Sequence, residues 1–400
     1  MSTQSTTSFK SRLPWVLFLT TLFLFNFLAR ILLAPLLPAI EEELKISHAA
    51  AASLFVYLSS GYFTALLGSS FLSARFSHRQ VLAGSGIAAG LVLLLGAASP
   101  SLATLRLTAL LLGLSSGPYL PSAIAILTTM IAEQHWGKAL AIHELAPNLA
   151  FTMAPLIAAL MLPHFSWRLV LGSPGIIAIV LGLLFLKLGS AGNFRGEAPK
   201  LKTFRNLLAL PTLWIMVYLF ALGIASTMGL FNMLPAYLVS YFGMPQETAN
   251  TLISLSRGFT IITVFLGGWA TDRIGAKRTL IVVLSITGVI TFTLGMVPEE
   301  AQILARIMVF LQPLLAVAFF PAGFAMLSAS VPTESRNLAV AMTVSLAFLI
   351  GGGIVPYVIG LCGDAGHFDH GFAVVGLLIA SGAAITPLLT RRTQYLKSKH

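Results

Sequence analysis

The sequence predicts an all-α polytopic membrane protein, and two features of its composition support that prediction. Apolar residues make up 57% of the 400 residues, whereas charged residues make up only 9%. Soluble domains carry about 25% charged residues, so this chain has too little polar surface to remain in water. Apolar runs of about 18 or more residues recur from end to end, and each can cross the ~30 Å hydrocarbon layer as a helix. Because these runs do not alternate polar with apolar residues, they exclude an outer-membrane β-barrel.

Twelve such runs are expected to be transmembrane helices. They cover residues 14–38, 50–73, 80–98, 103–129, 139–162, 168–187, 212–240, 248–270, 279–296, 302–329, 338–361 and 371–390. An even number of spans places both termini on one side of the membrane, and 18 of the 24 Lys and Arg residues then fall on that side. By the positive-inside rule this side is the cytoplasm. We therefore expect a multi-pass protein of the cell inner (plasma) membrane with both termini cytoplasmic.

The longest break between spans divides the chain near its midpoint. We expect an N-terminal six-helix bundle, a basic cytoplasmic linker and a C-terminal six-helix bundle at residues 1–188, 189–211 and 212–400. One shift superimposes the halves, because it carries Arg106 onto Arg306 and Pro121 onto Pro321. Two homologous halves of six helices are typical of secondary transporters, which bind their solute between the halves near the middle of the bilayer.

The break after the eighth span contains a motif of the form G-x-x-x-D-R-x-G-x-[KR]-[KR]. Its residues are Gly268, Asp272, Arg273, Gly275, Lys277 and Arg278. The chain thereby resembles the major facilitator superfamily, which carries this signature between the second and third helices of a half. The resemblance implies two rocking bundles with alternating access, a tight turn at the motif, and an Asp272 that caps a helix or pairs with a basic residue. The first-half copy is degraded, since Ala74 replaces the Asp and Ser77 the Gly.

Ionisable side chains at membrane depth are costly and therefore mark functional sites. Arg30 lies in the first span and Arg257 in the eighth. Members of the superfamily that carry organic anions often have an Arg at the first place, and monocarboxylate and oxalate carriers often bind substrate with an Arg of the eighth helix. A guanidinium presents a planar fork that matches a carboxylate. We expect these two residues to bind an anion between the halves; the alternative is that either one pairs with Glu144 or caps main-chain carbonyls.

Glu144 in the fifth span is the one deep carboxylate, and we expect it to border the solute cavity and to exchange the coupling proton. The alternative is a static salt bridge to an Arg. His143 points about 100° away around the helix, so we interpret it as a packing or interfacial residue. Further candidates for substrate binding, each of which could instead tie helices together, are Tyr57, Tyr62, Tyr119, Asn148 and Asn232.

These observations predict a secondary active transporter that works by proton-coupled symport of a small organic carboxylate, with Na⁺ as the alternative coupling ion. A competing interpretation is a proton-coupled drug or metabolite efflux antiporter, because Ala150–Ala159 keeps the frame of the exporter motif G-x-x-x-G-P-x-x-G-G with each Gly changed to Ala. A third interpretation, a non-transporting sensor, is not supported by an appended soluble domain.

No nucleophile–base pair, nucleotide loop or metal-ligand cluster appears, so we expect neither an enzyme nor a cofactor or metal. The expected partners are an anionic substrate, H⁺ and the lipid bilayer, without nucleic acid, and the chain is expected to be a monomer.

Overall fold

The computed structural model describes residues 9–189, 191–196, 201–331 and 335–389, and within these ranges the chain is helical without a strand. Twelve helices are long and apolar enough to cross a membrane, which confirms the expected number and order of spans. Their bounds are Phe9–Leu44, His48–Arg75, His78–Ala97, Leu102–Met130, Glu133–Met161, Trp167–Leu188, Pro211–Ser240, Gln246–Ile274, Ala276–Gly295, Gln302–Ser330, Leu338–Asp364 and Phe368–Ile385.

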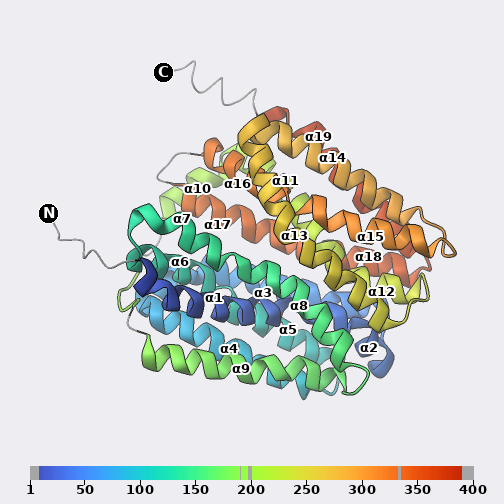
Figure 1. The fold of residues 1–400 in the computed structure, drawn as a ribbon, viewed down its shortest axis with the longest axis horizontal. Coiled ribbons are helices and arrows are strands. Elements are labelled where there is room, and N and C mark those ends of the chain that lie inside the picture. Colours follow the sequence, from blue (N-terminus) through green and yellow to red (C-terminus); the bar gives the residue numbers. More distant parts are fainter. Residues whose placement is uncertain (1–8, 190, 197–200, 332–334, 390–400) are drawn as a thin grey trace.

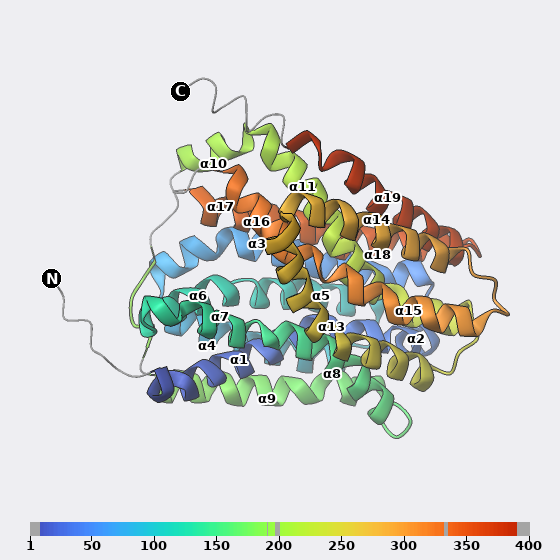
Figure 2. The same ribbon diagram turned by 45° about the horizontal axis from the view of Figure 1, so that its top comes forward.

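The two halves of the chain occupy separate sides of the molecule. Figure 1 shows the first six spans, blue to green, in the lower part and the last six, yellow to red, in the upper part. The first span begins and the last span ends at the same end of the bundle, which we call the terminal face; the other end is the opposite face (Figures 1 and 2). Six spans are single helices, and the first five of them are α3 (His48–Arg75), α4 (His78–Ala97), α9 (Trp167–Leu188), α13 (Gln246–Ile274) and α14 (Ala276–Gly295).

The connection between the halves contains a helix that the sequence did not predict, α10 (Leu201–Leu208). Its Leu207 is 2% exposed and packs in a cluster with Leu213, Val217 and Met342 of the second half. The short turn η1 (Glu133–His135) and the last span, α19 (Phe368–Ile385), complete the set of elements that are neither broken nor bulged. The chain ends beyond these elements, including Lys399, lie outside the described residues.

Four spans are interrupted where a proline removes one helical hydrogen bond. Pro35, Pro121, Pro147 and Pro321 have no N–H to offer the carbonyl four residues earlier, and each helix breaks at that carbonyl or at the residue after it. The breaks separate α1 (Phe9–Ile31) from α2 (Leu33–Leu44), α5 (Leu102–Ser116) from α6 (Tyr119–Met130), α7 (Trp136–His143) from α8 (Leu145–Met161), and α15 (Gln302–Ala316) from α16 (Phe319–Ser330).

Two spans of the second half contain a π-helical turn instead of a break. The seventh span runs through α11 (Pro211–Ile224), η2 (Ala225–Gly229) and α12 (Leu230–Ser240). The eleventh runs through α17 (Arg336–Ala347), η4 (Phe348–Ile354) and α18 (Val355–Asp364). The two turns pack backbone to backbone, because a Cβ on Gly229 would lie 2.4 Å from the carbonyl oxygen of Gly351. Turns of this kind are frequent at functional sites.

Side-chain hydrogen bonds join the two halves near the opposite face. Asp364 at the end of α18 accepts a 2.6 Å hydrogen bond from the hydroxyl of Ser47, the N-cap residue of α3. The carbonyl of Pro35 accepts hydrogen bonds from Gln246 at 3.0 Å and Asn250 at 3.2 Å. Together with the bonds of Asp364 to the first turn of α3, these contacts hold the two halves against each other at the opposite face.

Candidate substrate site between the two halves

Arg30 is enclosed by aromatic rings at the end of α1, two residues before the break at Leu32. Its side chain is 3% exposed, and the guanidinium carbon lies 4.4 Å from the ring centre of Phe27 and 4.5 Å from that of Tyr62. The ring of Phe348, in the π turn η4 of the other half, lies 5.8 Å away. The Nε atom is buried without a hydrogen-bond partner in the structure. Arg30 is therefore held by cation–π contacts and keeps hydrogen-bonding capacity unused.

Arg257 lies on α13 in the second half and is also buried, at 4% exposure. Its Nη2 donates a 2.6 Å hydrogen bond to the carbonyl of Thr227, which belongs to the π turn η2. The guanidinium carbon lies 4.8 Å from the ring centre of Phe151 and 5.1 Å from that of Phe231. One edge of the guanidinium is thus fixed by the main chain while aromatic rings cover its faces.

The two arginines rest on one group of rings, which we call the aromatic bridge: Phe27, Phe151 and Phe231. Phe27 and Phe151 meet edge to face at 5.3 Å, and Phe151 and Phe231 do so at 4.9 Å. Three successive contacts of 4.4, 5.3 and 4.8 Å therefore lead from the Arg30 guanidinium to that of Arg257. The hydroxyl of Ser254, one turn before Arg257, donates to the carbonyl of Thr152 at 2.8 Å and joins the halves beside the bridge. The structure thus places both predicted anion ligands at one surface between the halves.

Neither arginine has an acidic partner. Among the described residues, no carboxylate lies within 4.0 Å of either guanidinium. Neither arginine therefore forms the static salt bridge to Glu144 that was the alternative interpretation. The other alternative was that an arginine caps a main-chain carbonyl. Arg257 does so, because it donates a hydrogen bond to the carbonyl of Thr227.

Glu144 is the carboxylate that we expect from the sequence to border the solute cavity. It is the residue at which the fifth span breaks, between α7 and α8, and its side chain is 55% exposed. Its Oε1 lies 3.7 Å from Nδ1 of His143. The break leaves its carbonyl to accept a 3.1 Å hydrogen bond from the side chain of Asn148.

His143, interpreted from the sequence as a packing or interfacial residue, is 0% exposed at the centre of an aromatic stack. Its ring lies parallel to that of Phe23 at 4.5 Å and to that of Tyr119 at 6.0 Å. Tyr119 donates a 2.6 Å hydrogen bond to the carbonyl of Leu19 and lies 3.5 Å from Nε2 of His143. The sequence signal for this cluster is Pro147, three residues after Glu144. A proline there interrupts the helix beside His143 and Glu144 and changes the direction in which their side chains point.

Hydrogen bonds of the remaining candidates stay within their own half. Tyr62 lies against Arg30, and its ring centre lies 4.7 Å from that of Phe348 in the second half. Asn232 is 0% exposed and donates to the carbonyl of Gly352 at 3.0 Å, while its Oδ1 has no partner in the structure. Tyr57 is 40% exposed, and its ring lies 5.9 Å from the guanidinium carbon of Arg106. The assignment of Tyr57, Tyr119, Asn148 and Asn232 to substrate binding stays a prediction.

The motif residues form a turn that depends on glycine. Gly275 has φ +87° and ψ 148°, a conformation that favours glycine over any residue with a Cβ, and it separates α13 from α14. At the degraded first-half copy, Ser77 has φ −66° and instead caps α4 in a capping box with Gln80. Asp272 is exposed and forms no ion pair or hydrogen bond through its side chain with another described residue, so its predicted capping or pairing is not a feature of this structure. Arg273 lies 5.9 Å from the ring of Trp269.

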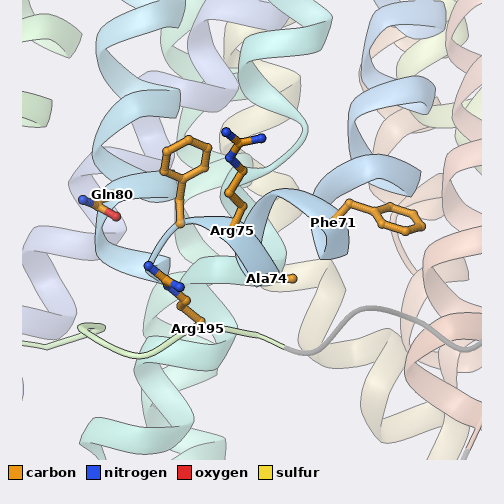
Figure 3. Close-up of a pocket in the computed structure, with 6 residues that line it drawn as sticks. Phe71, Ala74, Arg75, Gln80 and Arg195 are labelled. Carbon is orange, nitrogen blue, oxygen red and sulfur yellow. The ribbon is translucent and has the colours of Figure 1, made fainter.

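Two features lie away from the arginines. A pocket at the terminal end of α3 is lined by Phe71, Ala74, Arg75, Phe76, Gln80 and Arg195, and Figure 3 shows that its two guanidinium groups come from α3 and from the connection between the halves. At the opposite face, one ligand atom each from His367, Asp369 and His370 lie within 4.8 Å of one another, close enough to hold a metal ion.

Comparison with known proteins gives a consistent family. The family model described as Major Facilitator Superfamily matches residues 19–311 and 241–399. The chain is similar to a probable nitrate/nitrite transporter, NarK2, of Mycobacterium tuberculosis, with 27% identity over 219 residues, which are 54% of this chain and 52% of that protein. It is similar to the 4-hydroxybenzoate transporter PcaK of Pseudomonas putida, with 22% identity over 334 residues, which are 71% of this chain and 74% of that protein. The match thus spans about half the length of NarK2 and about three quarters of PcaK.

The fold is also that of solved transporters. A bacterial homologue of the human lysosomal transporter Spinster, in an inward-facing and occupied conformation, superimposes with a TM-score of 0.83. The superposition covers 96% of this chain and 98% of the other at 17% sequence identity. At that identity the likeness concerns the fold alone.

Proposed function

The chain belongs to the major facilitator superfamily of membrane transporters, and from this membership we propose that it carries a small organic anion together with a proton. It is a multi-pass membrane protein and, as family membership implies, a transporter rather than an enzyme. We place it in the cell inner membrane with both termini in the cytoplasm, on the distribution of Lys and Arg residues. The division into bundles at residues 1–188 and 212–400 joined by a cytoplasmic linker belongs to the same proposal.

The observation that carries the proposal is the pair of buried arginines without an acidic partner. An isolated buried charge is unfavourable by several kcal/mol unless it is paired. Cation–π contacts contribute about 2 kcal/mol when desolvated, but a ring supplies neither a negative charge nor a hydrogen-bond acceptor in the plane of the guanidinium. A substrate carboxylate placed between Arg30 and Arg257 would supply the missing negative charge and hydrogen-bond acceptors.

The rings around the arginines favour an aromatic acid within this class. Phe27, Phe151 and Phe231 offer apolar faces and edges on which an aromatic substrate ring could pack, in contacts of about 0.5–1.5 kcal/mol beyond area burial. NarK2 is named for nitrate and nitrite and PcaK for 4-hydroxybenzoate, and all three are anions. We therefore choose 4-hydroxybenzoate as the substrate to be tested. Nitrate serves as the comparison, because it is an anion without an aromatic ring.

The arginine hypothesis is tested by uptake of labelled 4-hydroxybenzoate into vesicles that contain the purified protein. Arg30→Lys and Arg257→Lys each keep the charge but remove the planar fork, and loss of a charged hydrogen bond weakens binding by about 1.5–3 kcal/mol, or roughly 10- to 150-fold. Arg306→Lys, a change at an exposed arginine of α15, is the matched control and should leave uptake unchanged. Full uptake by both Lys variants would show that the two arginines are structural.

The proton-coupling hypothesis concerns Glu144. Glu144→Gln cannot carry a proton, so it should abolish uptake driven by a pH gradient, whereas exchange of substrate across the membrane should persist. If binding, exchange and thermal stability all fall together, Glu144 is a structural residue. Normal gradient-driven uptake would refute proton transfer through Glu144 and favour Na⁺ coupling or uniport. Vesicles loaded with substrate on either side also separate symport from the competing efflux antiport, because an antiporter accumulates substrate against the direction of proton flow.

A further inference from the structure

A buried imidazole without a hydrogen-bond partner on one nitrogen lies beside the proposed proton site. His143 is 0% exposed, and its Nδ1 has no partner in the structure. A buried polar atom left unpaired is unfavourable by about 1–3 kcal/mol, so packing alone does not account for a histidine here. Phenylalanine would fill the same stack against Phe23 without this penalty.

The neighbours of the ring determine which nitrogen carries the proton. Tyr119 uses its own hydroxyl proton in the 2.6 Å hydrogen bond to the carbonyl of Leu19. Toward Nε2 of His143, 3.5 Å away, the Tyr119 oxygen can then act only as an acceptor. Nε2 is therefore the protonated nitrogen of the neutral ring, and Nδ1 is the basic one.

The basic nitrogen faces Glu144. Nδ1 lies 3.7 Å from Oε1 of Glu144, which is slightly beyond hydrogen-bond length and within reach after a small side-chain rotation. Glu144 is eleven residues into the span Glu133–Met161, about 16 Å along the helix from its first residue for a rise of 1.5 Å per residue. Its side chain is 55% exposed, and since ionised groups within spans line aqueous paths, we take this exposed side to face water.

We propose that Nδ1 of His143 takes up the coupling proton and that Glu144 passes it between the aqueous path and the imidazole. The inference deepens the proposed proton coupling and rests on it. A hydronium ion of the aqueous path protonates the Glu144 carboxylate and becomes water, and the carboxyl then transfers that proton to Nδ1, which leaves a carboxylate beside an imidazolium. Both imidazolium N–H groups then have acceptors, Nε2–H at Tyr119 and Nδ1–H at Glu144. These two are the titratable side chains that face the ring, while Phe23 covers its flat side.

The stack connects this site to the arginines along one face of α1. Phe23 meets Phe27 edge to face at 6.1 Å, and Phe27 lies 4.4 Å from the guanidinium carbon of Arg30. A substrate anion at Arg30 lowers the local positive potential and so favours a cation at His143. By linkage, the protonated imidazole favours the bound anion by the same factor. Proton and anion then bind together, as symport requires.

Nuclear magnetic resonance of protein labelled with ¹⁵N in its histidines tests the proton site directly, without a substrate. The chain has 8 histidines, and the His143 signal is identified as the one missing from His143→Gln or the one retained when the other seven are replaced. The proposal expects the Nε2–H tautomer of the neutral ring and gain of a proton at Nδ1 when the ring becomes charged. An Nδ1–H tautomer, or a ring that stays neutral throughout, would overturn it.

Transport by variants separates a proton carrier from a packing residue. His143→Gln keeps a donor for Tyr119 but cannot be protonated, so it should lose accumulation of 4-hydroxybenzoate driven by a pH gradient and retain exchange. His143→Phe, which preserves the stack, should behave in the same way. His164→Gln, at an exposed histidine between the fifth and sixth spans, is the control. Accumulation that persists in His143→Gln, or equal loss of accumulation and exchange, would overturn the inference. If the wild type does not carry 4-hydroxybenzoate, the proposed substrate class fails while the resonance measurement still decides the role of His143.

Discussion

The carboxylate of Asp364 holds the two halves together at the opposite face, and its removal should shift the conformational equilibrium. Asp364 accepts hydrogen bonds from the hydroxyl of Ser47 at 2.6 Å and from the main-chain N–H of Ala49 at 3.3 Å. These groups form the first turn of α3, so an acidic residue of the second half caps a helix of the first half. Any state that is open at this face must break this cap.

The size of the shift follows from the energy of the cap. Removing a helix cap is unfavourable by about 0.5–2 kcal/mol, and a negative charge at a helix N-terminus contributes about 0.3–1 kcal/mol. For this partly exposed site we take about 1–2 kcal/mol in Asp364→Ala, which is a factor of roughly 5–30 in an equilibrium constant. The interaction of Asp364 with its own helix α18 is present in both states and cancels. The population open at the opposite face should therefore rise by that factor.

Distances between two spin labels, measured by double electron–electron resonance, can detect this change. Spin labels at Glu42→Cys and Glu299→Cys, one exposed position in each half near the opposite face, are introduced after Cys362→Ser removes the single native cysteine. Asp364→Ala should increase the fraction of long distances, whereas Asp369→Asn, a neighbouring carboxylate that faces His370 of its own half at 3.9 Å, should not. An unchanged distribution in Asp364→Ala would refute the idea that this cap stabilises the closed face.

Three further predictions concern the fold and its orientation. Gly351→Ala should lower stability by about 1–3 kcal/mol, because the new Cβ would lie 2.4 Å from a main-chain oxygen, whereas Gly268→Ala, where a Cβ meets nothing within 4 Å, should leave the melting temperature unchanged. Equal melting temperatures of the two variants would contradict the close packing of the π turns. Gly275→Ala should be destabilised by about 1–3 kcal/mol through strain at φ +87°, measured by the same thermal unfolding assay; a wild-type melting temperature would show that the turn can rearrange. A reporter that is active only in the periplasm, fused after Lys399, should give no signal, and strong activity would overturn the cytoplasmic assignment of the termini.

The sequence was most informative about features that depend on its linear pattern. The spans follow from apolar runs, and the positions of Arg30 and Arg257 stand out because charges are rare in such runs. The helix angle that separated His143 from Glu144 was less reliable, because a spacing of 100° per residue holds only within one regular helix and the fifth span breaks at this place. The cap formed by Asp364 and Ser47 joins residues 317 positions apart, and no local pattern reveals such a contact.

The irregular backbone of the spans gathers at the proposed transport path. Arg30 precedes the break of the first span by two residues, Glu144 is the break of the fifth, and Arg257 donates to a carbonyl of the π turn in the seventh. Free carbonyls at membrane depth are tolerated only where protein buries them or water reaches them. Beside the aromatic bridge the described chain supplies two fixed cations and no fixed counter-charge within 4.0 Å of them. A bound anion would complete the charge balance from both halves at once, and its binding free energy would then be available to draw the two bundles together.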